Sequence, residues 1–414
     1  MSWADDPEPA DFGTQEYLAF CRAIGAEPTI VVNVEGRGAT LSEAAALRSA
    51  GKDIRGESRA ATAAEAANWV EYCNGPVTSK YGGLRARHGH AEPYHVKYWE
   101  VGNEIWGDWV RGYSDASTYG ANARRYIRAM KAVDPAIQII AVGHNDMAWN
   151  REVLQAVGRE IDILSIHHYQ GASEEAGDRF NLMARPLWYE SFYGRVHKLI
   201  QELVPGRKIT LAINEWNTTL PVPRQHSMES AIYGARLMNV FERQGDLVSM
   251  SAVSDLVNGW PGGIIQASRH RVFTTPTFAV VQAYNAHRGD WRLASSVQTP
   301  VIYQPADPEL GKDIPALDVV ASTTEAGDRI VLKVVNTSFT ENIQAELKLD
   351  HLARSLARDA SVTTINGPDI GASNSFATPD RVRARSSAFT GVGPQFAYTF
   401  ERHSVTIISL SAAK

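Results

Sequence analysis

HVKYWEVGNE, residues 95–104, shows the pattern from which the fold can be inferred. It is a short apolar run that ends in a polar Gly-Asn-Glu segment, as expected for a strand buried on both faces of a parallel sheet. Five further runs of this kind follow or precede it at intervals of roughly 40 residues. They are PTIVVNV (28–34), AIQIIAVG (136–143), DILSIHHY (162–169), KITLAINEW (208–216) and DLVSMSAVSDLV (246–257).

Helical patterns separate these runs between residues 14 and 290. Apolar residues recur at helical spacing in the segments 14–25, 62–73, 117–133, 147–158, 190–204, 228–245 and 275–288. Such alternation predicts βαβ units around a parallel sheet, and eight units close a (β/α)8 barrel of the TIM type. Because only six strands are visible, we expect an α/β fold with an incomplete barrel of about six units.

A second type of pattern begins after residue 290. Short alternating strands separated by polar turns occur there, for example RIVLKVVNTS (329–338) and VTIISLS (405–411). This pattern predicts an antiparallel β-sandwich. A chain of 414 residues is also too long for one ordinary domain. We therefore expect a barrel domain at 1–290 and a sandwich domain at 291–414.

The composition excludes several classes of protein. A formal net charge of −5 gives no basic surface for nucleic acid. No run approaches the roughly eighteen apolar residues of a membrane span. Two cysteines, Cys21 and Cys73, are too few for a disulfide framework or a structural zinc site, and no glycine-rich phosphate loop is present. We expect no metal, no cofactor and, because no signal peptide precedes residue 14, a cytoplasmic location.

Two glutamates, Glu104 and Glu215, stand at the ends of predicted strands. Each follows an asparagine and has tryptophan nearby. Catalytic groups of parallel barrels occupy the carboxyl ends of strands. A single glutamate there is more often a capping or salt-bridge residue. A pair in such surroundings fits glycoside hydrolysis, which needs one protonated and one ionised carboxyl group. The Trp216 ring is suited to stack on a sugar, and the Asn103 amide to bond its hydroxyls.

Several of these segments resemble glycoside hydrolase family 51, which consists mainly of α-L-arabinofuranosidases. The most specific are WVEYCNGP (69–76) and KYGGLRARHGHAEPYHVKYWEVGNEIWG (80–107). FGTQEYLAFCRAIGAEPTIVVNV (12–34), DILSIHHYQG (162–171) and INEWN (213–217) follow the family in the same order. The resemblance covers roughly residues 11–290, and the family also has a sandwich after its barrel.

The resemblance implies a role for each glutamate. Glu104 matches the general acid/base and Glu215 the nucleophile of a retaining, double-displacement mechanism, with the two carboxyl groups expected about 5–5.5 Å apart. Asn103 matches the residue that bonds the sugar 2-hydroxyl. The expected activity is exo-acting hydrolysis of α-L-arabinofuranosyl groups in plant polysaccharides or oligosaccharides.

The resemblance also suggests further substrate contacts. His167 and Tyr169 match a His-x-Tyr element, and Tyr169 is expected to lie beside the nucleophile and hold its geometry. Gln266, in the loop after the last predicted barrel strand, matches a glutamine that contacts the sugar. Asn33, at the end of the first predicted strand, could line the pocket or make a structural hydrogen bond.

Three features depart from the family pattern. The opening strands with their Arg-x-Pro-Gly-Gly-type segment are absent, Asn214 replaces an aspartate, and Thr219 replaces an aromatic residue. An incomplete barrel would expose two sheet edges, which proteins normally cover. The polar segment 35–61, a rearranged N-terminus or a second copy of the chain could cover them. We therefore expect a homo-oligomer.

Other functions are compatible with the same residues. A β-xylosidase or an endoglucanase would use the same two carboxylates, and pocket shape would distinguish them. A carbohydrate-binding protein without activity would keep the fold but lack the contacts of the opening strands. Retention of both glutamates favours an enzyme.

Overall fold

The computed structural model describes residues 12–34, 50, 62–110, 113–352 and 354–413. The expected polar segment 35–61 therefore lies outside the described residues, apart from residue 50. The chain divides into two compact units, one formed by residues 1–167 and 195–213, the other by residues 168–194 and 214–414. Each unit is described by itself, and the predicted boundary at residue 290 stays a prediction.

A six-stranded sheet in the order β1-β2-β3-β4-β5-β6 confirms the strands expected from the sequence. The strands are β1 (Thr29–Val32), β2 (Tyr98–Val101), β3 (Gln138–Val142), β4 (Ile163–Gln170), β5 (Thr210–Thr218) and β6 (Val248–Val253). Pairing from β1 to β4 is parallel, and Ile30 lies opposite Trp99. The first unit holds β1 to β3 and the first parts of β4 and β5. The last strand is shorter than the expected 246–257.

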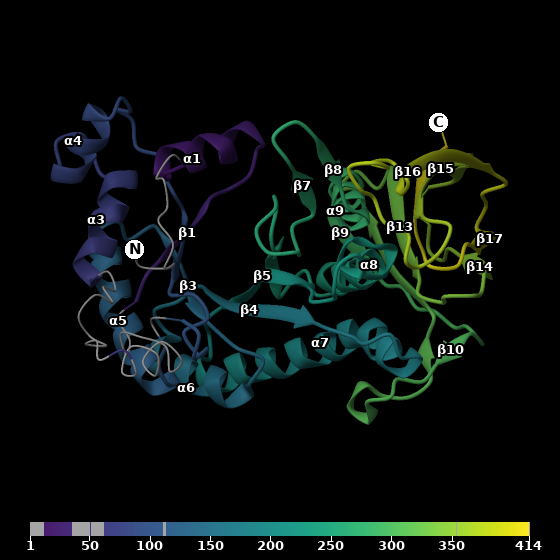
Figure 1. Ribbon diagram of the computed structural model, residues 1–414, viewed down its shortest axis with the longest axis horizontal. Helices are drawn as coiled ribbons and strands as arrows, with labels where there is room; N and C mark the ends of the chain where they lie inside the picture. Colours follow the sequence, from purple (N-terminus) through teal and green to yellow (C-terminus); the bar gives the residue numbers. More distant parts are fainter. Residues whose placement is uncertain (1–11, 35–49, 51–61, 111–112, 353, 414) are drawn as a thin grey trace. The chain divides into compact units, whose positions relative to one another are not determined.

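Figure 1 shows the helices of the first unit. They are α1 (Thr14–Ala23), α3 (Ala63–Asn74), α4 (Lys80–Arg87), α5 (Ala116–Val133) and α6 (Met147–Val157). The Asp115 carboxylate accepts a hydrogen bond from the backbone N–H of Thr118 at 2.8 Å and caps the N-terminus of α5. Helix α5 packs between α3 and α6. The Tyr119 hydroxyl of α5 donates to the carbonyl of Val101 at 2.7 Å and accepts the N–H of Val142 at 2.8 Å. One side chain thereby ties together the carboxyl ends of β2 and β3.

The second unit contains helices followed by the antiparallel sheets (Figure 1). Its helices are α8 (Met228–Arg243), α9 (Pro276–Ala286) and the first part of α7 (Ala176–Leu203). Helix α7 is longer than the expected 190–204 and continues through Pro186, which removes one backbone donor without ending it. Strands β7 (Ile265–Ala267) and β8 (Val272–Thr274) form a hairpin before α9.

The antiparallel strands after α9 confirm the expected C-terminal all-β region. One sheet has the order β16-β15-β18-β13-β12-β9, and β10-β11 and β14-β17 form two-stranded sheets. Strand bounds are β9 (Trp291–Leu293), β10 (Ile302–Tyr303), β11 (Ile314–Pro315), β12 (Leu317–Thr323), β13 (Arg329–Asn336), β14 (Ile343–Lys348), β15 (Leu356–Asn366), β16 (Arg383–Thr390), β17 (Gln395–Phe400) and β18 (Ser404–Ala412). Helix α8 packs on β12 and β13, and α9 packs on β15 and β16.

None of the helices in the described part of the chain has the length and apolar character needed to cross a bilayer.

Candidate active site

Glu104 stands in a tight turn directly after β2. Gly102 has φ +87°, and a Cβ added there would lie 2.7 Å from the Ile105 side chain, so a larger residue does not fit. Glu104 itself has φ +47°, in the left-handed region that residues other than glycine rarely adopt. The N–H of Gly107 donates to the Glu104 carbonyl at 2.7 Å and closes the turn. Backbone strain of this kind is concentrated at functional sites.

Two ring N–H groups hold the Glu104 carboxylate. His167, near the end of β4, donates from Nδ1 to Oε1 at 2.9 Å, and Trp109 donates from Nε1 to Oε2 at 3.1 Å. The His167 carbonyl in turn accepts a hydrogen bond from the Asn145 amide at 3.0 Å. Both Glu104 oxygens therefore have fixed donors, which orient the carboxylate.

An aromatic wall extends from the same turn. The Trp106 ring lies 5.2 Å from the Trp109 ring, edge to face, and 4.2 Å from the His144 ring. Burial lowers the pKa of His144. Its Nδ1 accepts the backbone N–H of Asp146 at 3.2 Å, which is the hydrogen bond of a neutral imidazole. The wall is thus aromatic and uncharged beside an acidic group.

Two other expected site residues lie at strand ends of the first unit. Asn33 follows β1 and is buried. Asn103 precedes Glu104 and is half-buried.

In the second unit, Tyr169 of β4 contacts Glu215 of β5. The Tyr169 hydroxyl donates to Glu215 Oε2 at 2.7 Å. The neighbouring His168 points to the other face of the strand, as alternation requires. It is fully buried, stacks on Tyr189 at 3.6 Å and bonds the Tyr193 hydroxyl at 2.8 Å. His168 is therefore part of the packing beneath the strand.

Alternation also separates Glu215 from Trp216. Trp216 is 2% exposed, and its ring lies 6.1 Å from Phe241 of α8. The expected stacking of this ring on a sugar therefore has no support from its position. The sequence pattern could not reveal this, because it does not show which face of β5 packs on the helix.

Two residues that the sequence reasoning did not select lie near Glu215. Asn217 donates to the carbonyls of Ser254 and, at 2.9 Å, Gly262. Trp260 places its ring edge to face with Tyr169, with centroids 5.7 Å apart. Gln266, which was selected, donates to the Gly263 carbonyl at 2.7 Å in the same loop. A tryptophan within the Gly-Trp-Pro-Gly-Gly segment 259–263 was the one sequence signal available for Trp260.

Comparison with known proteins agrees with these observations. Residues 1–185 match the α-L-arabinofuranosidase 1 domain, and residues 214–404 match the α-L-arabinofuranosidase C-terminal domain. A probable α-L-arabinofuranosidase C of Aspergillus clavatus is 26% identical over 432 residues, covering 98% of this chain and 78% of the relative. An intracellular exo-α-(1→5)-L-arabinofuranosidase of Streptomyces lividans is 27% identical, covering 92% of this chain and 57% of the relative.

A solved structure connects the two domains in one enzyme. The thermostable family 51 α-L-arabinofuranosidase of Thermotoga petrophila is 29% identical, has a TM-score of 0.83, and is matched over 99% of this chain and 80% of its own. The chain is an α-L-arabinofuranosidase-like glycoside hydrolase of family 51. The resemblance inferred from the motifs is thereby confirmed.

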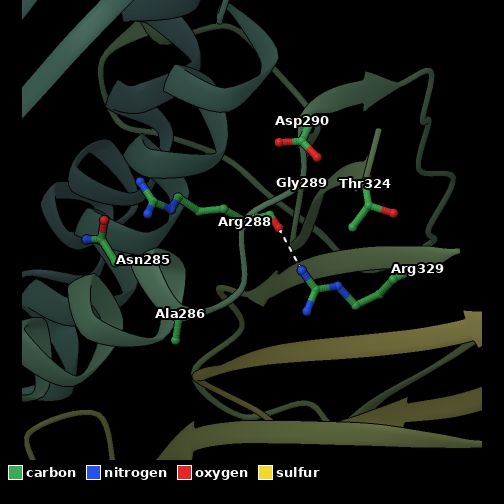
Figure 2. A pocket seen from close by; sticks show the side chains of 7 residues that line it. All are labelled: Asn285, Ala286, Arg288, Gly289, Asp290, Thr324 and Arg329. Carbon is green, nitrogen blue, oxygen red and sulfur yellow. Dashed lines mark hydrogen bonds between the residues drawn. The ribbon is translucent and has the colours of Figure 1, made fainter. Parts of the chain in front are cut away.

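This family 51 protein also has a cavity that the candidate site does not use. The cavity has a volume of about 460 Å³ and lies where α9 leads into β9. Figure 2 shows the side chains that line it. Asn285, Arg288, Asp290, Thr324 and Arg329 contribute to its lining. Arg329 donates to the Arg288 carbonyl at 3.2 Å across it. The lining includes none of the site residues expected from the sequence.

Proposed function

We propose that this family 51 protein is a retaining, exo-acting α-L-arabinofuranosidase. Its substrates are arabinose-containing plant polysaccharides or oligosaccharides. The names of the Aspergillus clavatus and Streptomyces lividans relatives support this activity. The observation that carries the proposal is that two residues of one strand each hydrogen-bond a carboxyl group.

That strand is β4. His167 bonds Glu104, and Tyr169 bonds Glu215. From the roles that the family pattern implies, we propose that Glu104 and Glu215 act on one substrate. Their carboxyl groups should then lie at the roughly 5–5.5 Å separation of a retaining enzyme.

The proposed reaction has two steps. Glu215 attacks the anomeric carbon and forms a covalent arabinosyl ester, while Glu104 donates a proton to the departing oxygen. Water then attacks the same carbon, Glu104 takes its proton, and Glu215 leaves. We assign Asn103, which is half-buried, to the sugar 2-hydroxyl because it matches the family residue that bonds this group. Tyr169 would orient the Glu215 carboxylate for attack.

Hydrolysis of an aryl α-L-arabinofuranoside tests the activity, with an aryl β-xyloside measured beside it. We expect arabinofuranoside turnover, and its loss by several orders of magnitude in Glu215→Ala. Faster turnover of the xyloside would mean that the protein is a β-xylosidase and not an arabinofuranosidase. A folded protein that cleaves neither substrate would contradict the proposal and favour a carbohydrate-binding role.

Azide separates the roles of the two glutamates. In Glu104→Ala, azide needs no general base, so it should react with the arabinosyl ester and give an azide of retained configuration. In Glu215→Ala, azide should replace the missing nucleophile and give the inverted product. If Glu104→Ala gave the inverted azide and Glu215→Ala the retained one, the two roles would be reversed.

We also propose that the protein associates with itself. Within the described residues, β1 and β6 each pair with a single neighbour in the sheet. Exposed edge strands favour association unless they are covered. Light scattering at micromolar concentration should give a multiple of 45.4 kDa, and a stable monomer would contradict this prediction.

We also propose that the protein is located inside the cell. Its support is the name of the Streptomyces lividans relative, which is described as intracellular. Activity should be found in the cell lysate, and activity mainly in the culture medium would contradict it.

A further inference from the structure

We infer that Trp260 is a positioning residue for the nucleophile: it holds the Tyr169 ring in the orientation from which the Tyr169 hydroxyl bonds Glu215. This inference rests on the proposed function, and it adds one residue to those that position the nucleophile. Trp260 lies in the loop between β6 and β7, and 91 residues of chain separate it from Tyr169.

The contact with Tyr169 is the first step. The two ring centroids are 5.7 Å apart with an interplanar angle of 71°, which is an edge-to-face pair. The Tyr169 hydroxyl reaches Glu215 Oε2 at 2.7 Å. A tyrosine hydroxyl lies on the axis of its ring, so a tilt of the ring moves the hydroxyl sideways. Lateral support of the ring therefore determines whether the hydroxyl stays on the carboxylate.

The Trp260 ring is held in turn by the backbone of its own loop. A Cβ added at Gly262 would lie 2.2 Å from Cζ2 of Trp260, so the indole packs directly on a backbone that only glycine allows. The N–H of Gly263 donates to the Trp260 carbonyl at 3.2 Å. The orientation of the indole is thus set by contacts within its own loop.

Two side chains fix this loop to the strand that carries Glu215 and to the helix that follows. Asn217, two residues after Glu215, donates to the Gly262 carbonyl at 2.9 Å. His226, just before α8, donates from Nε2 to the Pro261 carbonyl at 2.6 Å. A connected set of contacts therefore leads from β5 through the loop and Trp260 to Tyr169, and back to Glu215 on the same strand.

Core packing alone does not account for Trp260. The Trp260 side chain is half-buried, whereas Trp216 on β5 is almost completely buried. A tryptophan that served only to fill the core would be expected to be as buried as Trp216. We therefore expect removal of the Trp260 ring to affect the chemical step more than the stability of the fold.

A double-mutant cycle tests the inference on the full chain with an aryl α-L-arabinofuranoside. Trp260→Ala should lower kcat by roughly tenfold to a hundredfold with little change in KM, as expected for a displaced reacting group. Tyr169→Phe should lower kcat to a similar extent. The double variant should be no slower than Tyr169→Phe, because the indole acts only through the hydroxyl. Trp260→Phe should restore most of the rate.

Matched controls identify the alternatives. Trp291→Ala removes an exposed tryptophan in the same unit and should leave kcat and KM unchanged. Multiplicative effects of Trp260→Ala and Tyr169→Phe would overturn the inference, and so would a rise in KM with unchanged kcat, which would mean direct contact with substrate. If Trp260→Ala fails to fold, Trp260→Leu takes its place in the cycle, and multiplicative effects of Trp260→Leu and Tyr169→Phe would overturn the inference. Inactive wild-type protein would instead overturn the proposed function, and the inference with it.

Discussion

Arg85 shows how a single buried side chain can complete a helix end. It is 0% exposed and donates to the carbonyls of Tyr72 at 2.7 Å, Gly75 at 2.9 Å, His90 at 3.1 Å and Ala91 at 2.8 Å. The carbonyls at the C-terminus of α3 have no partner within the helix, and a cation is favourable there. The guanidinium satisfies them and also fixes the loop that leads to β2.

Replacement of this side chain should be costly. Arg85→Ala leaves several buried carbonyls without donors, so the free energy of unfolding should fall by about 3 kcal/mol. Arg87→Ala on the same helix is the control, because its side chain is exposed and its loss should change stability by less than about 0.5 kcal/mol. Urea denaturation measures both, and equal effects of the two variants would contradict the assigned role.

The turn between β17 and β18 depends on His403. Its ring is buried, and Nδ1 donates to Asn366 Oδ1 at 2.8 Å, which connects the turn to the end of β15. Burial is the main cause that lowers the pKa of His403 below 6.5. Arg402 acts in the same direction, and Asp369 and Glu401 act against it. The folded state therefore favours a neutral ring.

Because the pKa of His403 is lowered, the stability of this turn depends on pH, and the direction of the shift fixes the sign. Below pH 6.5 the unfolded chain protonates His403 before the folded chain does. The unfolded state then binds more protons, so this contribution to stability is complete above pH 6.5 and is lost as the pH falls toward the folded pKa. Wild-type protein should lose more unfolding free energy between pH 7.5 and 5.5 than His403→Gln. Parallel pH profiles in urea titrations would contradict this expectation.

At the scale of the whole molecule, a buried set of charges joins α8 to the antiparallel sheet within the second unit. Its members are Glu190, Arg236, Glu242, Arg243, Asp318 and Lys333. Arg243 bonds Glu190 at 2.9 Å and Asp318 at 3.1 Å. Lys333 is 1% exposed and pairs with Glu242, and burial lowers the pKa of Lys333 and raises that of Glu242. The pairs of Arg243 with Asp318 and of Lys333 with Glu242 cross residue 290, where the sequence pattern changes from helices to strands.

Breaking this set should destabilise residues on both sides of that position. Arg243→Ala leaves Glu190 and Asp318 without their main cation, so it should cost about 3–5 kcal/mol. Arg128→Ala removes a pair in which the arginine is 68% exposed and should cost at most about 1 kcal/mol. Thermal unfolding followed by circular dichroism compares them. An Arg243→Ala variant as stable as Arg128→Ala would show that the charges do not hold α8 on the sheet.

Local patterns in the chain were sufficient for the architecture and singled out the two glutamates at strand ends. The six apolar runs predicted all six strands of the parallel sheet, because strands buried on both faces leave a continuous apolar signature. Glu104 and Glu215 were recognisable because a carboxylate at the end of such a strand is rarely tolerated without a use. The motifs around them were enough to indicate family 51.

Other features depend on contacts between distant segments, and no local pattern encodes these. The amino-acid sequence was enough to establish the alternation of strands and helices, the later antiparallel strands and the positions of the two glutamates. Folding in three dimensions was needed to show that Trp216 faces helix α8 and that Trp260 contacts Tyr169. The physical reason is that spacing along a strand specifies alternation between two faces, whereas the partner on each face comes from chain segments brought together by long loops.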